Sequence, residues 1–370
     1  MVPTGKLFGR KLLVYAPKAR QKCRGGGGRY WKSFGHNIFE KIINLENLFL
    51  AWREFRRGKR SKLDVQKFEF KLEDNLFTIH DQLASGIYVN NPYVSFYITD
   101  PKLRHIHKAS VRDRVINQAV FRVLYPIFDK VFAYDSYSCR DNKGLHKAVD
   151  RLELFLRRVS RNYQEPVWVL KCDVKKFFDS VDQERLFGFI CKRLFDRRAL
   201  DLVERIISSF SVSAGKGLPL GNVTSQLFAN IYLNELDQFI KHQLRVKYYL
   251  RYCDDFIILD NGKKYLSGLI DKINEFLKNN LELELHPRKI IIRKYRQGID
   301  YLGYVCLPHY RVPRTKTKRR ILRVLVGKSY LVKQGRFSQT IFYSSLQSYF
   351  GVLKHCRGFK VKQQILSVIK

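Results

Sequence analysis

The chain has 370 residues, and its 70 lysines and arginines against 33 aspartates and glutamates give a formal net charge of +37. With 45% hydrophobic and 14% aromatic residues it can bury substantial cores, which excludes a disordered basic tail. Basic residues occur throughout the chain, so a polyanionic partner is expected, and nucleic acid is the first candidate.

Membrane and secretory segments are not expected. The sequence holds no apolar run of about 18 residues, and Lys11 to Ala16 is too short for the apolar core of a signal peptide. The 7 cysteines include no pair at a two-residue metal-ligand spacing, so reduced thiols are predicted. These features predict a cytoplasmic protein without a membrane partner.

The first 165 residues are predicted to be mainly helical after a basic arm. Residues 1–35 are rich in glycine and basic side chains. His105 and His107 stand two apart and, because nothing nearby completes a metal-ligand set, are interpreted as surface or RNA-facing side chains. Apolar spacing predicts helices over 37–58, 65–83, 111–128 and 145–159, and short strands over 87–89 and 93–98.

From residue 166 strands and helices alternate as in an α+β domain. The segment 248–260 predicts a β-hairpin with Asp254 and Asp255 at its turn. A buried strand over 167–174 ends at Asp173. Further helices are expected: one begins near 183, one ends at 206–210, and two cover 224–244 and 265–281. A glycine- and proline-containing loop is expected at 215–221, a strand near 292 and a strand-like piece at 299–305. The chain from residue 311 is basic and is expected to be partly helical.

Three carboxylates are the candidate site. An Asp-Asp pair at a turn is usually solvated, but Asp254 and Asp255 are flanked by apolar runs, and desolvation would increase their mutual repulsion. A divalent cation relieves that repulsion, and Asp173 at a strand end offers a third ligand. Such a set can hold two divalent ions about 3.5–4 Å apart, which is the arrangement used for nucleotidyl transfer.

These motifs, in this order, resemble a reverse transcriptase over roughly residues 112–305. Tyr252-Cys253-Asp254-Asp255 matches the Tyr-x-Asp-Asp signature, and Asp173 to Asp179 matches the first metal-binding motif. The resemblance implies two Mg²⁺ ions, with Mn²⁺ as a substitute, and an RNA template, a cDNA or primer strand and dNTPs as partners. The implied metal ligands are Asp173, Val174, Asp254 and Asp255.

The same resemblance assigns further roles. Lys289 is implied to protonate the departing pyrophosphate, and Phe178 to act as an aromatic gate that excludes ribonucleotides. Arg112, Arg114 and Arg140 lie in motifs that hold template and triphosphate. Leu220, Gly221 and Gln226 fall in the nucleotide-binding loop and helix, and Tyr301, Leu302 and Gly303 fall in the primer grip.

The implied architecture is a right-hand polymerase fold of α+β class. Its palm would be an antiparallel sheet with helices on one face, and its thumb basic and mainly helical. The expected boundaries are an arm at 1–35, mostly helical fingers that include part of the palm at 36–165, the palm with the catalytic aspartates at 166–298, a primer-grip segment at 299–310 and a thumb at 311–370.

One departure narrows the resemblance. Most reverse transcriptases have glutamine before the glycine of the loop that leads into the long helix, whereas this chain has Leu220 before Gly221, followed by Ser225 and Gln226. That pattern resembles the reverse transcriptases of diversity-generating retroelements. The family copies a template-repeat RNA with errors at adenines for mutagenic retrohoming, and uses an oligomer of a small basic accessory variability protein. Because leucine cannot hydrogen-bond the nucleotide, the looser pocket is expected to relax fidelity.

Other interpretations remain open. A retron, group II intron or defence-associated reverse transcriptase would share the three aspartates. A different class, a non-catalytic RNA-binding scaffold, would share the basic surface but would leave three carboxylates in apolar surroundings without a cation.

Overall fold

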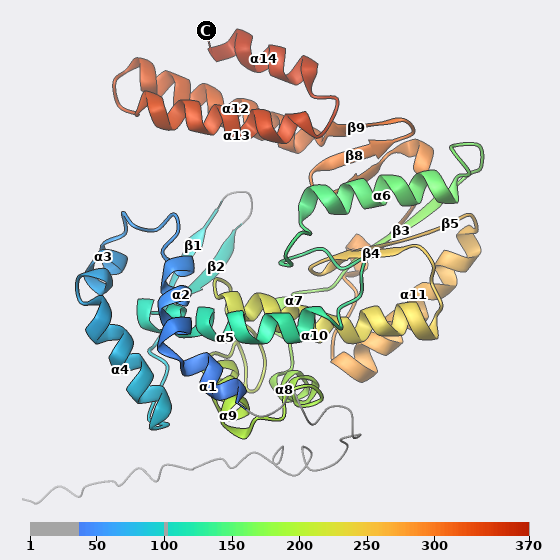
Figure 1. Cartoon of the computed structure of the whole chain (residues 1–370). Coiled ribbons are helices and arrows are strands. Elements are labelled where there is room, and N and C mark those ends of the chain that lie inside the picture. The colour runs from blue at the N-terminus through green and yellow to red at the C-terminus, as the bar shows by residue number, and fades with distance from the viewer. Residues whose placement is uncertain (1–36, 100–102, 370) are drawn as a thin grey trace, which may run out of the picture.

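The computed structural model describes residues 37–99 and 103–369, so the predicted arm over 1–35 lies outside the described residues. The first predicted helices are each divided in two (Figure 1). At Asn44 a ψ of 132° interrupts the helix, while the Asn44 side chain accepts a hydrogen bond from the Glu46 amide at 2.8 Å. A second break falls at Lys71. The resulting helices are α1 (Ile38–Ile43), α2 (Leu45–Phe55), α3 (Leu63–Phe70) and α4 (Leu72–Ala84).

An antiparallel hairpin, β1 (Val94–Ile98) and β2 (Arg104–Lys108), follows these helices. The strand predicted at 87–89 is wrong, because carbonyls of that segment bind arginine side chains instead of a neighbouring strand. Arg205 donates to the Tyr88 carbonyl at 3.2 Å, and Arg112 donates to the Val89 carbonyl. The next two helices, α5 (Val111–Asp129) and α6 (Leu145–Val159), form where apolar spacing predicts them.

The central sheet is antiparallel throughout and has the strand order β4-β5-β3-β6. Its strands are β3 (Trp168–Asp173), β4 (Tyr249–Tyr252), β5 (Asp255–Asp260) and β6 (Ile291–Lys294). The connecting helices are α7 (Phe177–Ser180), α8 (Gln183–Cys191), α9 (Arg197–Ser208), α10 (Val223–Gln238) and α11 (Lys263–Leu281). The helix predicted to reach residue 244 changes to a π-helix at Phe239–Gln243.

Both faces of the central sheet are covered by helices, one face more than predicted. Successive strand residues point to opposite faces, so Leu170 and Ile258 enter a core shared with α10 and α11. Val169 and Leu259 enter a second core, which α6 completes from the other side. In Figure 1 α6 lies over one side of the sheet and α11 over the other.

A second sheet follows, with β7 (Ile299–Tyr301), β8 (Tyr304–Leu307) and β9 (Tyr310–Pro313) in order. The single strand predicted over 299–305 is therefore wrong: the chain reverses at Leu302 and Gly303, both at positive φ, 48° and 91°. The chain then forms α12 (Thr315–Lys333), α13 (Gln339–Lys354) and α14 (Phe359–Ile369), which enclose a third, small core. The predicted α+β class is thereby confirmed.

Arg311 of β9 ties this C-terminal part to α6, since its guanidinium lies 2.7 Å from an Asp150 oxygen. Of the helices within the described ranges, none combines the length and the apolar character needed to cross a membrane.

Candidate active site

Strand register brings the three predicted carboxylates together. Asp173 ends β3 and pairs directly with Asp255, the first residue of β5. Because Asp255 also pairs with Tyr252 of β4, Cys253 and Asp254 form a two-residue turn. The Asp254 carbonyl accepts a hydrogen bond from the Val174 amide at 3.2 Å, which joins this turn to the end of β3. The hairpin predicted over 248–260 therefore forms, and its neighbour is the strand that carries the third carboxylate.

Lysines neutralise two of these carboxylates. The Lys289 ammonium lies 2.5 Å from Asp173 Oδ2, and the Lys171 ammonium lies 3.1 Å from Asp255 Oδ2. Burial nevertheless raises the pKa of Asp255 to about 6, with Lys171 opposing the shift and Asp173 and Asp254 adding to it. Burial also raises the pKa of Asp254, and the charge of Asp173 adds to the effect. The site thus holds more negative charge than its own side chains compensate.

The donor set fits a hard divalent cation. Carboxylate and carbonyl oxygens from Asp173, Asp254, Asp255 and Val174 are the ligand type that Mg²⁺ prefers. The Oδ1 atom of Asp255 is buried and has no hydrogen-bond partner, so it is an oxygen left for such an ion. Within the described residues, no group of three or more His, Cys, Asp or Glu side chains is already arranged as a metal-binding cluster.

Arg251, which was not predicted as a site residue, holds the turn in place through hydrogen bonds. Its guanidinium is 1% exposed and forms two bonds with Asp237, from Nε at 2.7 Å and from Nη2 at 2.6 Å. Its Nη1 donates to the Cys253 carbonyl at 2.9 Å. The remaining donors reach Asn230 and Ser136. An arginine inside an otherwise apolar strand was the available signal, because a buried charge requires a partner.

Four of the predicted nucleotide-binding residues lie in the segment from α7 to the first turn of α10. Phe178, in α7, is partly buried against the first core, and its carbonyl accepts a hydrogen bond from the Leu218 amide at 2.8 Å. Leu220 is half-buried, and its carbonyl accepts from the His107 amide of β2 at 3.1 Å. Gly221 has a φ of +125°, and Gln226 is exposed on the first turn of α10.

The structure does not bring the three predicted arginines together with the carboxylates. Each one binds groups of its own neighbourhood: Arg112 bonds to Gln82 at 3.2 Å, Arg114 to Asp64 at 2.8 Å, and Arg140 to Asp129 at 2.7 Å. Their assignment to template and triphosphate stays a prediction.

The predicted primer-grip residues lie on the β7–β8 hairpin. Tyr301 is fully buried, its hydroxyl has no hydrogen-bond partner, and its ring centroid lies 5.7 Å from the Lys171 ammonium. Leu302 and Gly303 form the turn, where the Gly303 carbonyl accepts a hydrogen bond from the Arg314 amide at 2.9 Å. Lys171, which bonds both to Asp255 and to the Asp300 carbonyl, thus links the carboxylates to this hairpin.

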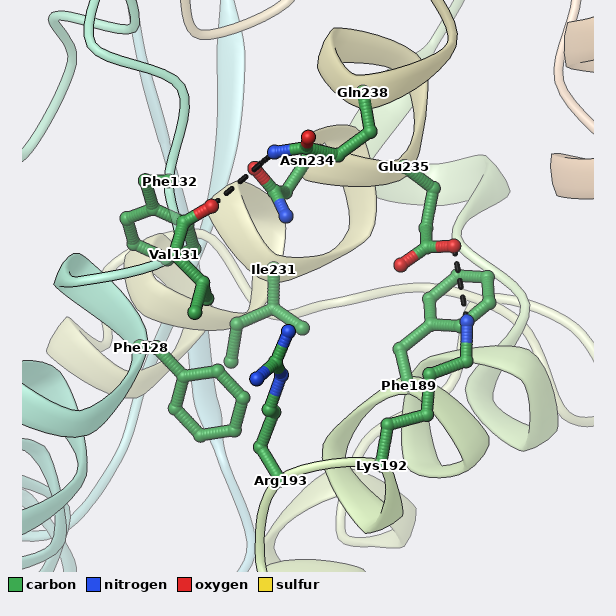
Figure 2. A pocket seen from close by; sticks show the side chains of 10 residues that line it. All are labelled: Phe128, Val131, Phe132, Phe189, Lys192, Arg193, Ile231, Asn234, Glu235 and Gln238. Carbon is green, nitrogen blue, oxygen red and sulfur yellow. Dashed lines mark hydrogen bonds and ion pairs between the residues drawn. The ribbon is translucent and has the colours of Figure 1, made fainter. Parts of the chain in front are cut away.

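A cavity of about 370 Å³ lies elsewhere, between α5, α8 and α10 (Figure 2). Lys192 and Glu235 form an ion pair at 3.0 Å on one side, and Gln238 donates to the Val131 carbonyl at 3.2 Å on the other. Its lining includes none of the predicted site residues, so it is separate from the carboxylates.

Comparison with known proteins gives matches across the same region. The family model "Reverse transcriptase (RNA-dependent DNA polymerase)" matches residues 99–306. Protein YkfC of Escherichia coli (strain K12) is 26% identical over 274 residues, covering 63% of this chain and 71% of YkfC. The group II intron-encoded protein LtrA of Lactococcus lactis subsp. cremoris is 24% identical over 320 residues, covering 67% of this chain, which spans about half, 51%, of LtrA. A structure of apo telomerase from Candida tropicalis, truncated from its C-terminal domain, has a TM-score of 0.46 and 14% identity, covering 63% of this chain and 59% of that one.

Proposed function

The chain belongs to the reverse transcriptase (RNA-dependent DNA polymerase) family, and we propose that it copies an RNA template into DNA at Asp173, Asp254 and Asp255. The right-hand polymerase fold predicted from the sequence is confirmed by this membership and by the mixed helix and sheet architecture. The observation that carries the proposal is the register that pairs Asp173 with Asp255 while Asp254 occupies the adjoining turn.

The proposed reaction joins a primer 3′-hydroxyl to the α-phosphorus of a dNTP. The new P–O bond forms as the bond to pyrophosphate breaks, and the hydroxyl loses its proton to solvent water. Bound divalent ions supply Lewis-acid activation of the hydroxyl and neutralise charge on the phosphates. Asp173, Asp254, Asp255 and the Val174 carbonyl would hold those ions. Lys289, paired with Asp173 at 2.5 Å in the structure, donates a proton to the departing pyrophosphate.

The test is a double substitution, Asp254→Asn with Asp255→Asn. Primer extension on an RNA template is expected to be lost, because neutral amides cannot replace the anionic ligands. Binding of the RNA is expected to remain, because the basic surface is unchanged. Asp271→Asn on the exposed side of α11 is the matched control for loss of one negative charge and should extend primers normally. Continued cDNA synthesis by the double variant would refute the assignment.

We propose further that synthesis is error-prone at template adenines, as in diversity-generating retroelements. The support is Leu220 in place of glutamine: a glutamine could hydrogen-bond the nucleotide, whereas leucine offers only apolar contact. A template-repeat RNA would then be the natural template, and an oligomer of a small basic accessory variability protein the partner.

Leu220→Gln tests this finer proposal. Errors at adenines in the cDNA are expected to fall about tenfold if the new hydrogen bond contributes about 1.4 kcal/mol of selectivity. Leu220→Met, which keeps the size without adding a carbonyl, should keep the parental error rate. Sequencing of cDNA from all three proteins gives the rates, and an unchanged rate in Leu220→Gln would contradict the role of this residue.

A second candidate, copying of a group II intron RNA, is favoured by the match to LtrA, a group II intron-encoded protein, over 67% of this chain. The neighbouring DNA distinguishes the two. A nearby pair of repeats that differ only at adenines supports mutagenic retrohoming, whereas intron sequence flanking the gene supports the second candidate.

A further inference from the structure

A row of ring side chains in contact runs along one face of the β1–β2 hairpin. Tyr97 pairs directly with His105 across the strands, and their rings are nearly parallel, with centroids 4.4 Å apart and planes 7° apart. His107 is two residues further along β2 and therefore lies on the same face. Its ring centroid is 4.3 Å from that of His105 and 4.5 Å from that of Phe210. These four rings thus form a continuous row from the hairpin to Phe210, just after the end of α9.

The two ends of this row differ. Tyr97 is 65% exposed, so the face of its ring that is turned away from His105 is open to solvent. At the other end Phe210 packs edge-on against Tyr93 at 5.6 Å, and the Tyr93 hydroxyl accepts a hydrogen bond from Asn222 at 3.1 Å. Asn222 is the residue before α10, so the row leads from solvent to the loop that contains Leu220.

The row is also bonded to the nucleotide-binding loop. The His107 amide donates to the Leu220 carbonyl at 3.1 Å. Burial lowers the pKa of His107, and the neighbouring His105 adds to the effect. Arg104 and Lys108, which begin and end β2, lie an odd number of residues from His105 and so point to the opposite face of the hairpin, where Lys108 pairs with Asp64 at 2.7 Å. Figure 1 shows the hairpin projecting from the helical N-terminal region toward the side where α12 and α13 lie.

We propose that Tyr97 and His105 form a stacking platform for an unpaired base of the single-stranded template as it approaches the active site. This inference rests on the proposed function. A flat ring stack that is open at one end fits a nucleobase, because every base has a π-face and such stacking tolerates any sequence. The connection through His107 to Leu220 gives that strand a path toward the nucleotide.

The test uses 2-aminopurine, a fluorescent adenine analogue that is quenched by stacking, placed at successive positions in the unpaired 5′ overhang of a primer–template. Without dNTPs and at one fixed salt concentration, the parent protein is expected to quench one position strongly. Tyr97→Ala and His105→Ala should lose that quenching and weaken overhang binding by roughly 5- to 150-fold. Tyr97→Phe and His105→Phe, which keep a ring, should retain both. Tyr265→Ala, which removes a 44% exposed tyrosine from α11, is the control and should change neither.

The platform is overturned if Tyr97→Ala quenches 2-aminopurine and binds the overhang as well as the parent protein does. A lower melting temperature of that variant would then mean that the rings only stabilise the hairpin. Loss of affinity for a blunt duplex as large as for the overhang would also overturn the platform. RNA and DNA overhangs of one sequence show which strand is preferred, and a Tyr97-dependent quench on either supports the platform. Primer extension by the parent protein is measured separately and tests the proposed function. If Tyr97→Ala loses the quenching but the parent protein extends no primer, the platform is supported and only the polymerase assignment is overturned.

Discussion

Arg251 lies inside β4 with 1% of its surface exposed, and it connects the turn that carries Asp254 to α10. Its pairing with Asp237 is fully buried on both sides, and the Tyr249 hydroxyl donates to the same carboxylate at 2.5 Å. The other bonds of the guanidinium reach Asn230, Ser136 and the carbonyl of Cys253, which itself has the positive φ of 56°. Arg251 is therefore a positioning residue: it holds the backbone that orients Asp254 without reaching the carboxylate itself.

Substitution of Arg251 should separate stability from positioning. Arg251→Met leaves Asp237 buried and unpaired, which is expected to cost about 3–5 kcal/mol of folding free energy. Adding Asp237→Asn removes the orphaned charge and should restore much of the stability, while the Cys253 carbonyl remains without its donor. We expect kcat for primer extension to stay low in the double variant with little change in KM for dNTP.

Urea denaturation and steady-state extension measure the two effects. The matched control is the exposed pair Lys192 and Glu235, replaced by methionine and glutamine, which should cost at most about 1 kcal/mol and leave kcat unchanged. Recovery of kcat in parallel with stability would show that Arg251 only supports the fold.

Asp255 gives a second prediction at this scale, which concerns pH. Burial raises its pKa from the ordinary 3.8 to about 6, so the folded protein binds this proton more tightly than the unfolded chain does. The free energy of unfolding therefore falls as pH rises from about 4 to 6, and above that range the ionised carboxylate costs up to about 3 kcal/mol. Without divalent ions, Asp255→Asn should be more stable than the parent at pH 7.5 and should lose this advantage near pH 4.

Thermal melts in EDTA at the two pH values check this expectation. A difference between variant and parent that is the same at both pH values would mean that Asp255 is ionised without penalty in the folded protein.

The β7–β8 hairpin depends on Gly298, which precedes β7 with a φ of +80°. A Cβ atom there would lie 2.8 Å from Val305 Cγ1 on the facing strand, closer than such atoms approach. Gly298→Ala is expected to lower the free energy of unfolding by about 1–3 kcal/mol, from the left-handed backbone together with the contact. Gly327→Ala in α12 is the control: its Cβ would meet nothing within 4 Å, and alanine should stabilise the helix by up to about 1 kcal/mol. Equal urea midpoints for the two variants would contradict this account.

Elements whose signals are local were predictable from the sequence. The hairpin over 248–260 was found because β-branched and aromatic runs flank Asp254 on both sides. The reversal at Leu302 was missed, because leucine rarely occupies the left-handed conformation that this turn requires. The break at Asn44 was missed because the apolar spacing continues through it.

Features that depend on contacts between residues far apart in the sequence were not predictable in the same way. The carboxylate cluster and Lys289 were predicted from motifs, but the pairing of Lys171 with Asp255 was not, since these two residues meet only through the β3–β5 register. Arg114 was expected to face a phosphate, yet Asp64, 50 residues earlier, lies against it. The sequence shows that a charge exists and not which group compensates it.

At the scale of the whole molecule, one hydrophobic core extends across the predicted boundary at residue 165. Helix α6 lies before that boundary, but its apolar side packs with strands β4 and β5 and with the β7–β9 sheet. The fingers and palm boundaries remain a functional proposal, while packing joins α6 to the region that carries the carboxylates.

This arrangement has a consequence for synthesis on the ribosome. The apolar stripe of α6 is complete at Val159, but the strands β4 and β5 that cover it are finished only with Leu259, which is made 100 residues later (259 − 159). At roughly 5–20 residues per second, that is a delay of roughly 5 to 20 s. During that interval the nascent chain carries an amphipathic helix whose apolar side is not yet covered by β4 and β5, so α6 is a segment suited to a chaperone.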